Sequence, residues 1–257
     1  MFSVTPIPAF SDNYIWLLKL PNSRKVAVVD PGDAAPVIRY LNDNNFELDV
    51  ILITHHHYDH TDGVKELTDR YQVPVYGPHN SPFSGITHFL KEGEKLDIWG
   101  QQLIIKEIPG HTLDHISYFI NGEQPQLFCG DTLFLAGCGR LFEGTPKQML
   151  AAMTHFQSLP DNTEVYCTHE YSLANLAFAE AVEPENTDVK DAINLCSKLR
   201  NSDRPTLPTT IAQEKRINPF MRSDQVSVIT AAQKFTHQTQ LDQEAVFAAI
   251  REWKNQF

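Results

Sequence analysis

The chain has 257 residues, enough for one large domain or for a main domain of about 170 residues with a smaller appendage. Hydrophobic residues make up 42% of it and charged residues 21%, which predicts a packed globular core and excludes general disorder. The formal net charge of −11 disfavours binding along nucleic-acid backbones, although a local basic pocket could still bind a small anion.

The first half of the sequence alternates short strand-like runs with helical patterns. Residues 14–20 and 25–29 predict a hairpin across the turn "PNSR", and residues 35–45 predict a helix. The continuous apolar run at 48–54 is typical of a strand that is covered on both faces. A helix over 61–71 and a short strand over 73–77 follow, so this order predicts a sheet with helices packed outside it.

From about residue 95 the pattern becomes rich in strands and then purely helical. Strand-like runs cover 95–100, 102–110, 116–120 and 126–131, and a helix is predicted over 145–159 with Pro146 in its first turn. A last strand-like run spans 163–171. The segments 172–182, 186–203, 223–236 and 241–253 all predict helices. This change predicts two domains, a catalytic domain over residues 1–170 and a helical substrate-binding domain over 171–257.

Other segments bear on the cellular compartment. The sequence has no run of about 18 apolar residues, so we expect no membrane span. The first residues lack the basic and apolar segments of a signal peptide. The four cysteines show no C-x-x-C spacing, so we expect free buried thiols in a reducing compartment. We therefore expect a cytoplasmic, monomeric protein that binds neither membranes nor nucleic acid.

The stretch "THHHYDH" (54–60) gathers metal-ligand side chains directly after the apolar strand. Ligand sites form beyond the ends of strands in open α/β sheets. Because alternate residues of an extended segment point the same way, His55 and His57 can converge on one ion. His56 should then point elsewhere. Asp59 and His60 follow a turn and can serve a second ion nearby.

Three further side chains occupy the same kind of position, each after an apolar run and before a turn: His111, Asp131 and His169. Three ligands leave an ion incomplete, so other segments must contribute. His115 is expected to play a structural or supporting part. The remaining histidines at 79, 88, 155 and 237 lack this context and are expected to lie at the surface or to be satisfied locally.

The succession THHHYDH, PGHT, GDT and THEY resembles the metallo-β-lactamase superfamily of hydrolases. The resemblance implies a four-layer αββα sandwich with two metal ions at one edge. It implies that His55, His57 and His111 hold the first ion, that Asp59, His60 and His169 hold the second, and that Asp131 bridges both. Asp30, in "VVDPGD", resembles an acid that orients a ligand in this family, although a simple turn residue explains it equally well.

Charge counting supports a reaction with water. Two divalent ions with the carboxylates of Asp59 and Asp131 leave a net positive site, which lowers the pKa of bound water from 15.7 towards roughly 7. We therefore expect a metal-bridging hydroxide to attack a carbonyl, with Asp59 and Asp131 as the catalytic protein groups. Imidazole and carboxylate ligands suit zinc, and also iron or manganese.

Further segments resemble glyoxalase II, the hydroxyacylglutathione hydrolases: "PAFSDNYIWLL", "FLAGCGRLFEGTP", "THEYSLANLAFA" and "INPFMR". This resemblance covers nearly the whole chain. It implies hydrolysis of S-D-lactoylglutathione to glutathione and D-lactate, the second step of methylglyoxal detoxification. The residues that it implies for binding the glutathione part are Arg140, Phe142, Tyr171 and Arg222.

Two positions depart from the pattern, since Phe142 stands where some members have tyrosine, and Ser223-Asp224-Gln225 stands where some members are basic. Both departures concern glutathione affinity and not the reaction. The arginines at 140 and 222 suit the two carboxylates of glutathione, which an arginine can grip with parallel hydrogen bonds.

Other functions share parts of this pattern. A lactonase or β-lactamase would not need the helical tail with "INPFMR". A persulfide dioxygenase uses a single iron, and the presence of Asp59, His60 and His169 favours two metals. An RNA-processing nuclease conflicts with the acidic charge. A metal-binding module without catalysis is disfavoured, because the seven ligand-type residues would leave open coordination positions on the ions that they bind.

Overall fold

The N-terminal strands form an antiparallel hairpin that continues into a six-stranded sheet. The computed structural model describes all residues 1–257. Strands β1 (Ser3–Ala9), β2 (Asn13–Lys19) and β3 (Lys25–Val29) pair antiparallel, with Trp16 opposite Val29 and Lys19 opposite Val26. The hairpin predicted over residues 14–29 is therefore confirmed. Strand β1 was not predicted, because its alternating prolines weaken the strand pattern.

Parallel strands complete this sheet in the order β1-β2-β3-β4-β5-β6. Strands β4 (Glu47–Leu52), β5 (Val75–Pro78) and β6 (His88–Leu90) run parallel to β3. Helix α1 (Ala34–Asn44) connects β3 to β4, and α2 (Tyr58–Thr61) with α3 (Val64–Tyr71) follows β4. The helix predicted over 61–71 is confirmed as α3, which begins three residues later, and α2 was not predicted.

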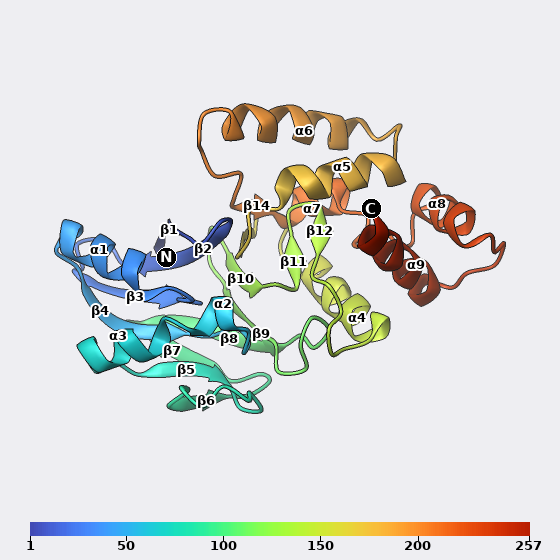
Figure 1. Cartoon of the computed structure of the whole chain (residues 1–257). Coiled ribbons are helices and arrows are strands. Elements are labelled where there is room, and N and C mark those ends of the chain that lie inside the picture. Colours follow the sequence, from blue (N-terminus) through green and yellow to red (C-terminus); the bar gives the residue numbers. More distant parts are fainter. The chain divides into compact units, whose positions relative to one another are not determined.

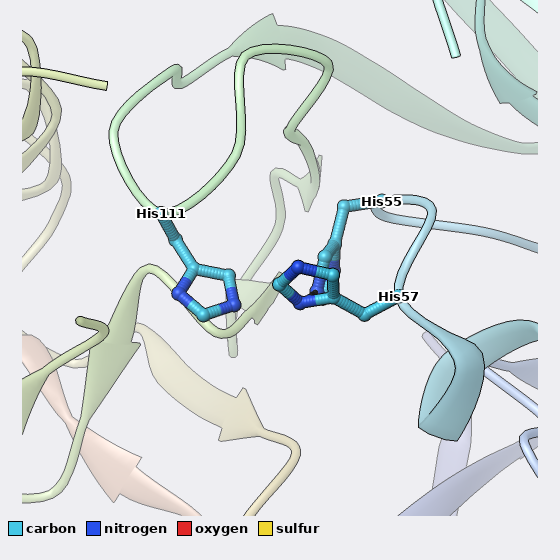
Figure 2. A group of neighbouring side chains, drawn as sticks. All are labelled: His55, His57 and His111. Carbon is cyan, nitrogen blue, oxygen red and sulfur yellow. Dashed lines mark hydrogen bonds between the residues drawn. The ribbon is translucent and has the colours of Figure 1, made fainter. Parts of the chain in front are cut away.

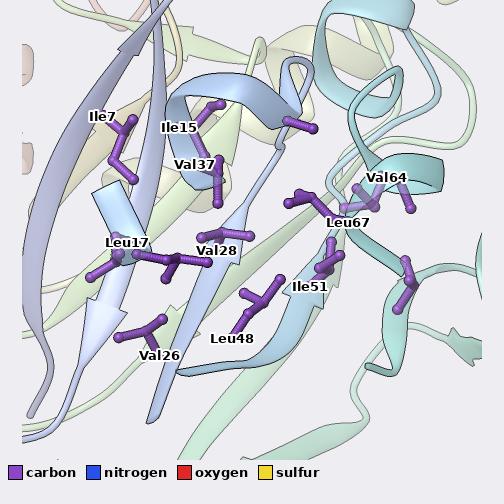
Figure 3. Close-up of a cluster of buried hydrophobic side chains, with 14 of the residues drawn as sticks. Ile7, Ile15, Leu17, Val26, Val28, Val37, Leu48, Ile51, Val64 and Leu67 are labelled. Atoms are coloured by element: carbon purple, nitrogen blue, oxygen red, sulfur yellow. The ribbon is translucent and has the colours of Figure 1, made fainter. Parts of the chain in front are cut away.

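The core of this sheet lies under its helices. Side chains from alternate positions of β2, β3 and β4 pack against the apolar faces of α1 and α3 (Figure 3). Ile51 and Leu52 are both completely buried although they point to opposite faces of the sheet. The expectation that residues 48–54 form a strand covered on both faces is therefore confirmed, and this strand carries the histidine segment at its end.

A second group of strands forms an antiparallel meander. It consists of β7 (Lys95–Ile98), β8 (Gln101–Glu107), β9 (Ile116–Ile120) and β10 (Gln126–Gly130). The buried hydroxyl of Tyr118 on β9 donates to the carbonyl of Ile53 at 2.7 Å, so the meander is tied to the end of β4.

The chain divides into two compact units, residues 1–108 with 114–130 and residues 109–113 with 131–257. The second unit contains β11 (Leu133–Phe134), β12 (Gly137–Cys138), α4 (Pro146–Gln157), β13 (Glu164–Cys167) and β14 (Thr209–Thr210). Its other helices are α5 (Ser172–Val182), α6 (Thr187–Arg200), α7 (Ile211–Ile217), α8 (Val226–Thr236) and α9 (Gln243–Gln256). These units do not coincide with the predicted boundary at 170/171, which stays a prediction.

The helices predicted in the second unit are all present. Helix α4 begins at Thr145 with a capping box to Gln148, and Pro146 takes its first position as expected. Helix α5 packs on α6, and α9 packs on α8 and α4 (Figure 1). Helix α7 and strand β14 were not predicted. No helix is both long enough and apolar enough to cross a membrane.

Candidate metal centre

The end of β4 presents His55 and His57 together. Their ring nitrogens, Nε2 of His55 and Nδ1 of His57, lie 3.1 Å apart. The hydroxyl of Thr54 donates a hydrogen bond to Asp30 at 2.7 Å. Because its proton is used in this way, the hydroxyl oxygen can accept the Nδ1 proton of His55 at 3.1 Å. This chain of hydrogen bonds leaves the lone pair of His55 on Nε2, the atom that faces His57.

The short helix α2 brings Asp59 and His60 together. Oδ2 of Asp59 lies 3.5 Å from Nε2 of His60 and accepts a hydrogen bond from the side-chain amide of Asn13 at 3.1 Å. Asn13 is buried at the start of β2, and its contact with Asp59 spans 46 residues of sequence. Its amide therefore fixes one carboxylate oxygen of a predicted metal ligand.

Asp30 links the two halves of this segment. The residue has a positive φ of 52° and is buried, and Oδ2 lies 3.0 Å from Nδ1 of His60. A carboxylate accepts hydrogen bonds, so Nδ1 of His60 carries the proton and Nε2 offers its lone pair. Two residues later, Gly32 packs closely against α2: a Cβ at this position would lie 1.8 Å from the carbonyl oxygen of Asp59. The geometry supports an orienting role for Asp30.

The neighbouring histidines point elsewhere or provide support. Nδ1 of His56 lies 2.9 Å from the buried carboxylate of Asp114, away from the pair formed by His55 and His57. His115 is completely buried and its ring stacks on that of His55, with centroids 4.5 Å apart and planes 13° from parallel. His115 thus holds the ring of His55 by packing.

In the second unit, Asp131 lies between two histidines. Its Oδ2 is 3.5 Å from Nε2 of His111 and 3.3 Å from Nε2 of His169. All three residues are buried. The carbonyl of Arg140 accepts from Nδ1 of His111 at 2.7 Å, which fixes the proton on Nδ1 and the lone pair on Nε2.

Some of the residues predicted to bind substrate contact His111 and His169. The ring of Phe142 meets that of His111 edge-on at 5.3 Å, and the ring of Tyr171 stacks on that of His169 at 4.6 Å. Arg140, Phe142 and Tyr171 are all exposed. These side chains therefore lie at the open side of the two histidines.

Arg222 is held by a carboxylate. Its guanidinium donates to both oxygens of the buried Glu183, at 2.7 and 2.9 Å, and to the carbonyl of Lys215 at 3.1 Å. Burial works to raise the pKa of Glu183, but hydrogen bonds from Arg222 and Ser227 and the charge of Arg222 outweigh it and lower the pKa. Arg222 also lines a cavity of about 810 Å³ together with Arg216 and Lys234.

The motif "INPFMR" has a second role that the sequence did not reveal. The side-chain amide of Asn218 donates to the carbonyl of Gly137 at 2.9 Å and to Glu214 at 2.9 Å. Glu214 is buried and accepts the backbone N–H of Ala136 at 2.8 Å. Glu214 in α7 and Asn218 at the C-terminal end of this helix therefore hold the hairpin formed by β11 and β12.

The donor atoms of the predicted ligands form compact groups within each unit. Figure 2 shows the rings of His55 and His57 together at the end of β4, and Asp59 lies beside His60. In the other unit, Asp131 lies between His111 and His169. Imidazole nitrogens with carboxylates among them form the donor set expected for divalent transition metals, and a carboxylate or carbonyl holds the Nδ1 proton of His60 and of His111.

Asn13, Thr54, Glu214 and Asn218 were missed as supporting residues. Each acts through a hydrogen bond to a distant segment, so no local pattern marks it. The only sequence signal for any of them is that Asn13 and Asn218 lie within segments that resemble a known family. The exposed positions of His79, His88 and His237 fit their expected place at the surface.

Comparisons with known proteins agree with the geometry. A family model described as the metallo-beta-lactamase superfamily matches residues 10–169, and one described as the hydroxyacylglutathione hydrolase C-terminus matches residues 170–257. The hydroxyacylglutathione hydrolases of Chromohalobacter salexigens and Pseudomonas putida are 47% and 48% identical, each over 100% of both chains.

Solved structures show the same fold at lower identity. ETHE1 from Myxococcus xanthus is 23% identical, with a TM-score of 0.65 over 99% of this chain and 98% of that one. The BLEG-1 B3 metallo-beta-lactamase is 24% identical, with a TM-score of 0.63 over 86% of this chain and 99% of that one. The predicted metallo-β-lactamase fold with a helical C-terminal domain is confirmed. The chain belongs to the hydroxyacylglutathione hydrolases, or glyoxalase II, within the metallo-beta-lactamase superfamily.

Proposed function

We propose that this protein hydrolyses S-(2-hydroxyacyl)glutathione thioesters, with S-D-lactoylglutathione as its substrate and glutathione and D-lactate as products. This is the second step of methylglyoxal detoxification. One observation carries the proposal: a chain that matches hydroxyacylglutathione hydrolases over its full length also clusters the ligand-type side chains of a metallohydrolase within each of its two units. That full-length match disfavours a lactonase or a persulfide dioxygenase.

The proposed metal ligands are those of the sequence prediction. His55, His57 and His111 would hold one divalent cation, Asp59, His60 and His169 a second, and Asp131 would contact both. The position of Asp131 Oδ2 between His111 and His169 supports its shared role. We propose zinc at both positions, although the same donors suit iron or manganese. Bound cations would acidify a water molecule and polarise the thioester carbonyl.

The protein groups around these ligands control protons and charge. Asp30 and the carbonyl of Arg140 keep the proton on Nδ1 of His60 and His111, so that each ring offers Nε2 to a cation. Asp59 and Asp131 supply negative charge and are the proposed catalytic carboxylates. The amide of Asn13 fixes the orientation of Asp59.

The glutathione part would bind beside these ligands. Tyr171 and Phe142 lie against His169 and His111, and the exposed guanidinium of Arg140 suits a carboxylate of glutathione. Arg222 is proposed as a further carboxylate contact from the cavity that it lines. Its bidentate pair with Glu183 would hold the guanidinium ready for that contact.

The remaining assignments extend the sequence predictions. We propose a monomer that acts in the cytoplasm, without nucleic-acid or membrane partners; its four buried cysteines fit a reducing compartment. We also propose the boundary between a catalytic domain 1–170 and a substrate-binding domain 171–257, because the two family models meet between residues 169 and 170.

The decisive experiment compares Asp131→Ala with His79→Ala. Asp131→Ala should lose bound metal and lactoylglutathione hydrolysis together, with kcat/KM down by more than about a hundredfold, because it removes a shared ligand. His79→Ala changes an exposed histidine and should leave both unchanged. Elemental analysis gives the metal content, and a coenzyme A thioester tests the acyl carrier. Full activity of Asp131→Ala, or equal rates on both thioesters, would contradict the proposal.

A further inference from the structure

Arg251 on α9 is a buried cation without a carboxylate partner. It is 7% exposed, and its guanidinium lies 5.0 Å from the ring centre of Phe220. One terminal nitrogen donates to the carbonyl of Cys138 at 2.7 Å and the other to the side-chain oxygen of Asn255 at 3.2 Å, while Nε has no hydrogen-bond partner. Burial raises the pKa of the Cys138 thiol, so this sulfur does not balance the charge.

Such an arrangement is poorly explained by folding stability alone. A buried charge without an opposite charge is destabilising, and an apolar residue of the same volume would often be neutral or better. The one strong contact is the short hydrogen bond to the Cys138 carbonyl, which spans 113 residues of sequence. The function of Arg251 should therefore be sought in what that carbonyl holds.

Cys138 is the first residue of the segment Cys138–Gly139–Arg140, called here the histidine-support segment. Gly139 fits tightly, because a Cβ there would lie 2.0 Å from the carbonyl oxygen of Asp131 and 3.0 Å from Nδ1 of His111. The backbone N–H of Gly139 donates to Thr132 at 3.2 Å. The next carbonyl, that of Arg140, accepts from Nδ1 of His111. A shift of this segment would thus change the partner that fixes the proton of His111.

We propose that Arg251 is a positioning residue for the metal centre: by holding the Cys138 carbonyl it places the Arg140 carbonyl against Nδ1 of His111. The inference rests on the proposed role of His111 as a metal ligand. Arg251 touches neither substrate nor ligand itself. Its effect passes through two backbone carbonyls, so it should act on metal affinity and turnover.

The test uses Arg251→Met, Arg251→Lys and the control Asn255→Ala. Methionine keeps the packing on Phe220 but removes the donors, lysine can still donate one hydrogen bond to Cys138, and Asn255→Ala removes the other side-chain partner of Arg251. Arg251→Met should weaken zinc affinity of the chelator-treated protein by about tenfold or more, as loss of a supporting hydrogen bond does elsewhere. Its kcat should fall as well.

Arg251→Lys should recover part of the zinc affinity, and Asn255→Ala should retain all of it. The Nδ1 proton of His111, followed by NMR in the zinc-loaded protein, should shift in Arg251→Met, shift less in Arg251→Lys and stay in place in Asn255→Ala. If Arg251→Met does not fold, Arg251→Lys must show an intermediate loss of zinc affinity, with Asn255→Ala unchanged.

Wild-type zinc affinity in folded Arg251→Met, or in Arg251→Lys when only that variant folds, would overturn the inference, as would an equal loss in Asn255→Ala. His111→Ala separates this failure from a failure of the proposed function. If His111→Ala loses zinc while Arg251→Met does not, only the positioning role is wrong. If His111→Ala also keeps its zinc, the proposed ligand set is wrong.

Discussion

At the scale of single residues, Glu214 shows how burial competes with hydrogen bonding. Burial raises the pKa of this carboxyl to about 7, even though Thr209, Asn218 and the N–H of Ala136 all donate to it and lower the pKa. The native state therefore binds a proton between about pH 4.5 and 7 that the unfolded chain releases, so this group makes stability fall as the pH rises through that window.

Glu214→Gln should remove this pH dependence. A glutamine can keep one oxygen toward Ala136 and Asn218 and can donate to the Thr209 hydroxyl, so no buried group loses its partner. We expect the variant to be more stable than the wild type at pH 8, by about 3 kcal/mol at most, and nearly equal at pH 4.5. Urea unfolding at both values measures this. A lower stability of Glu214→Gln than of the wild type at pH 8 would show that the charge is favourable there.

Arg222 supports a prediction with two separable effects. Removing it in Arg222→Ala leaves the buried carboxylate of Glu183 without its main partner, which should lower the free energy of unfolding by about 3 kcal/mol at pH 7. Because the pKa of Glu183 is lowered, the wild type should lose this advantage as the pH falls below about 4.5.

A substrate role for Arg222 adds a raised KM for lactoylglutathione with kcat little changed. Adding Glu183→Gln to Arg222→Ala should restore part of the stability but not the KM, which separates the two roles. An unaltered KM in Arg222→Ala would leave this arginine with a structural role only.

The ligand-type residues were visible in the sequence because their chemistry and their position after apolar strands coincide. Their supporters were not, since Asn13 reaches Asp59 over 46 residues and Arg251 reaches Cys138 over 113. A residue whose partner is chosen by the tertiary fold carries no local signal. Sequence reasoning therefore finds groups that can bind a metal and misses those that fix where their protons lie.

At the scale of elements, periodicity predicted most helices and strands. Helix α7 was missed because its seven residues include the polar run Gln213 to Arg216 and its buried acid breaks the apolar stripe. Helix α3 begins three residues later than predicted because Gly63 packs where a Cβ would lie 2.4 Å from the carbonyl oxygen of Pro31, a tertiary contact, and the four-residue helix α2 was not predicted. Short elements fixed by packing thus escape patterns that hold over two or more turns.

Gly139→Ala tests the histidine-support segment as an element. The added Cβ would clash with the backbone of Asp131 at 2.0 Å, so the segment must move and take the partner of His111 with it. We expect at least a tenfold loss of zinc affinity and of kcat. Gly122→Ala is the control, because its Cβ would meet only the flexible end of Met1. Normal zinc binding in Gly139→Ala would show that the segment can adjust without cost to the ligands.

At the scale of the whole molecule, the predicted ligands come from segments between residues 55 and 169, and Asp131 and His169, 38 residues apart, already meet within one unit. A cation that binds the native state alone stabilises it by about 4 kcal/mol when its concentration exceeds the Kd a thousandfold. Chelation should therefore lower the melting temperature, and added zinc should restore it. The comparison is made by calorimetry on one preparation, and an identical melting temperature with and without chelator would argue against bound metal.

The position of Arg251 has a consequence for synthesis. Translation produces His111 and the histidine-support segment long before α9, which supplies the hydrogen bond to Cys138. A nascent polypeptide stalled before residue 251 would carry every ligand-type side chain yet lack the clamp that steadies one of them. Full zinc affinity would then develop only after α9 has been synthesised and has packed, and a chain that lacks it would hold the ion about tenfold more weakly.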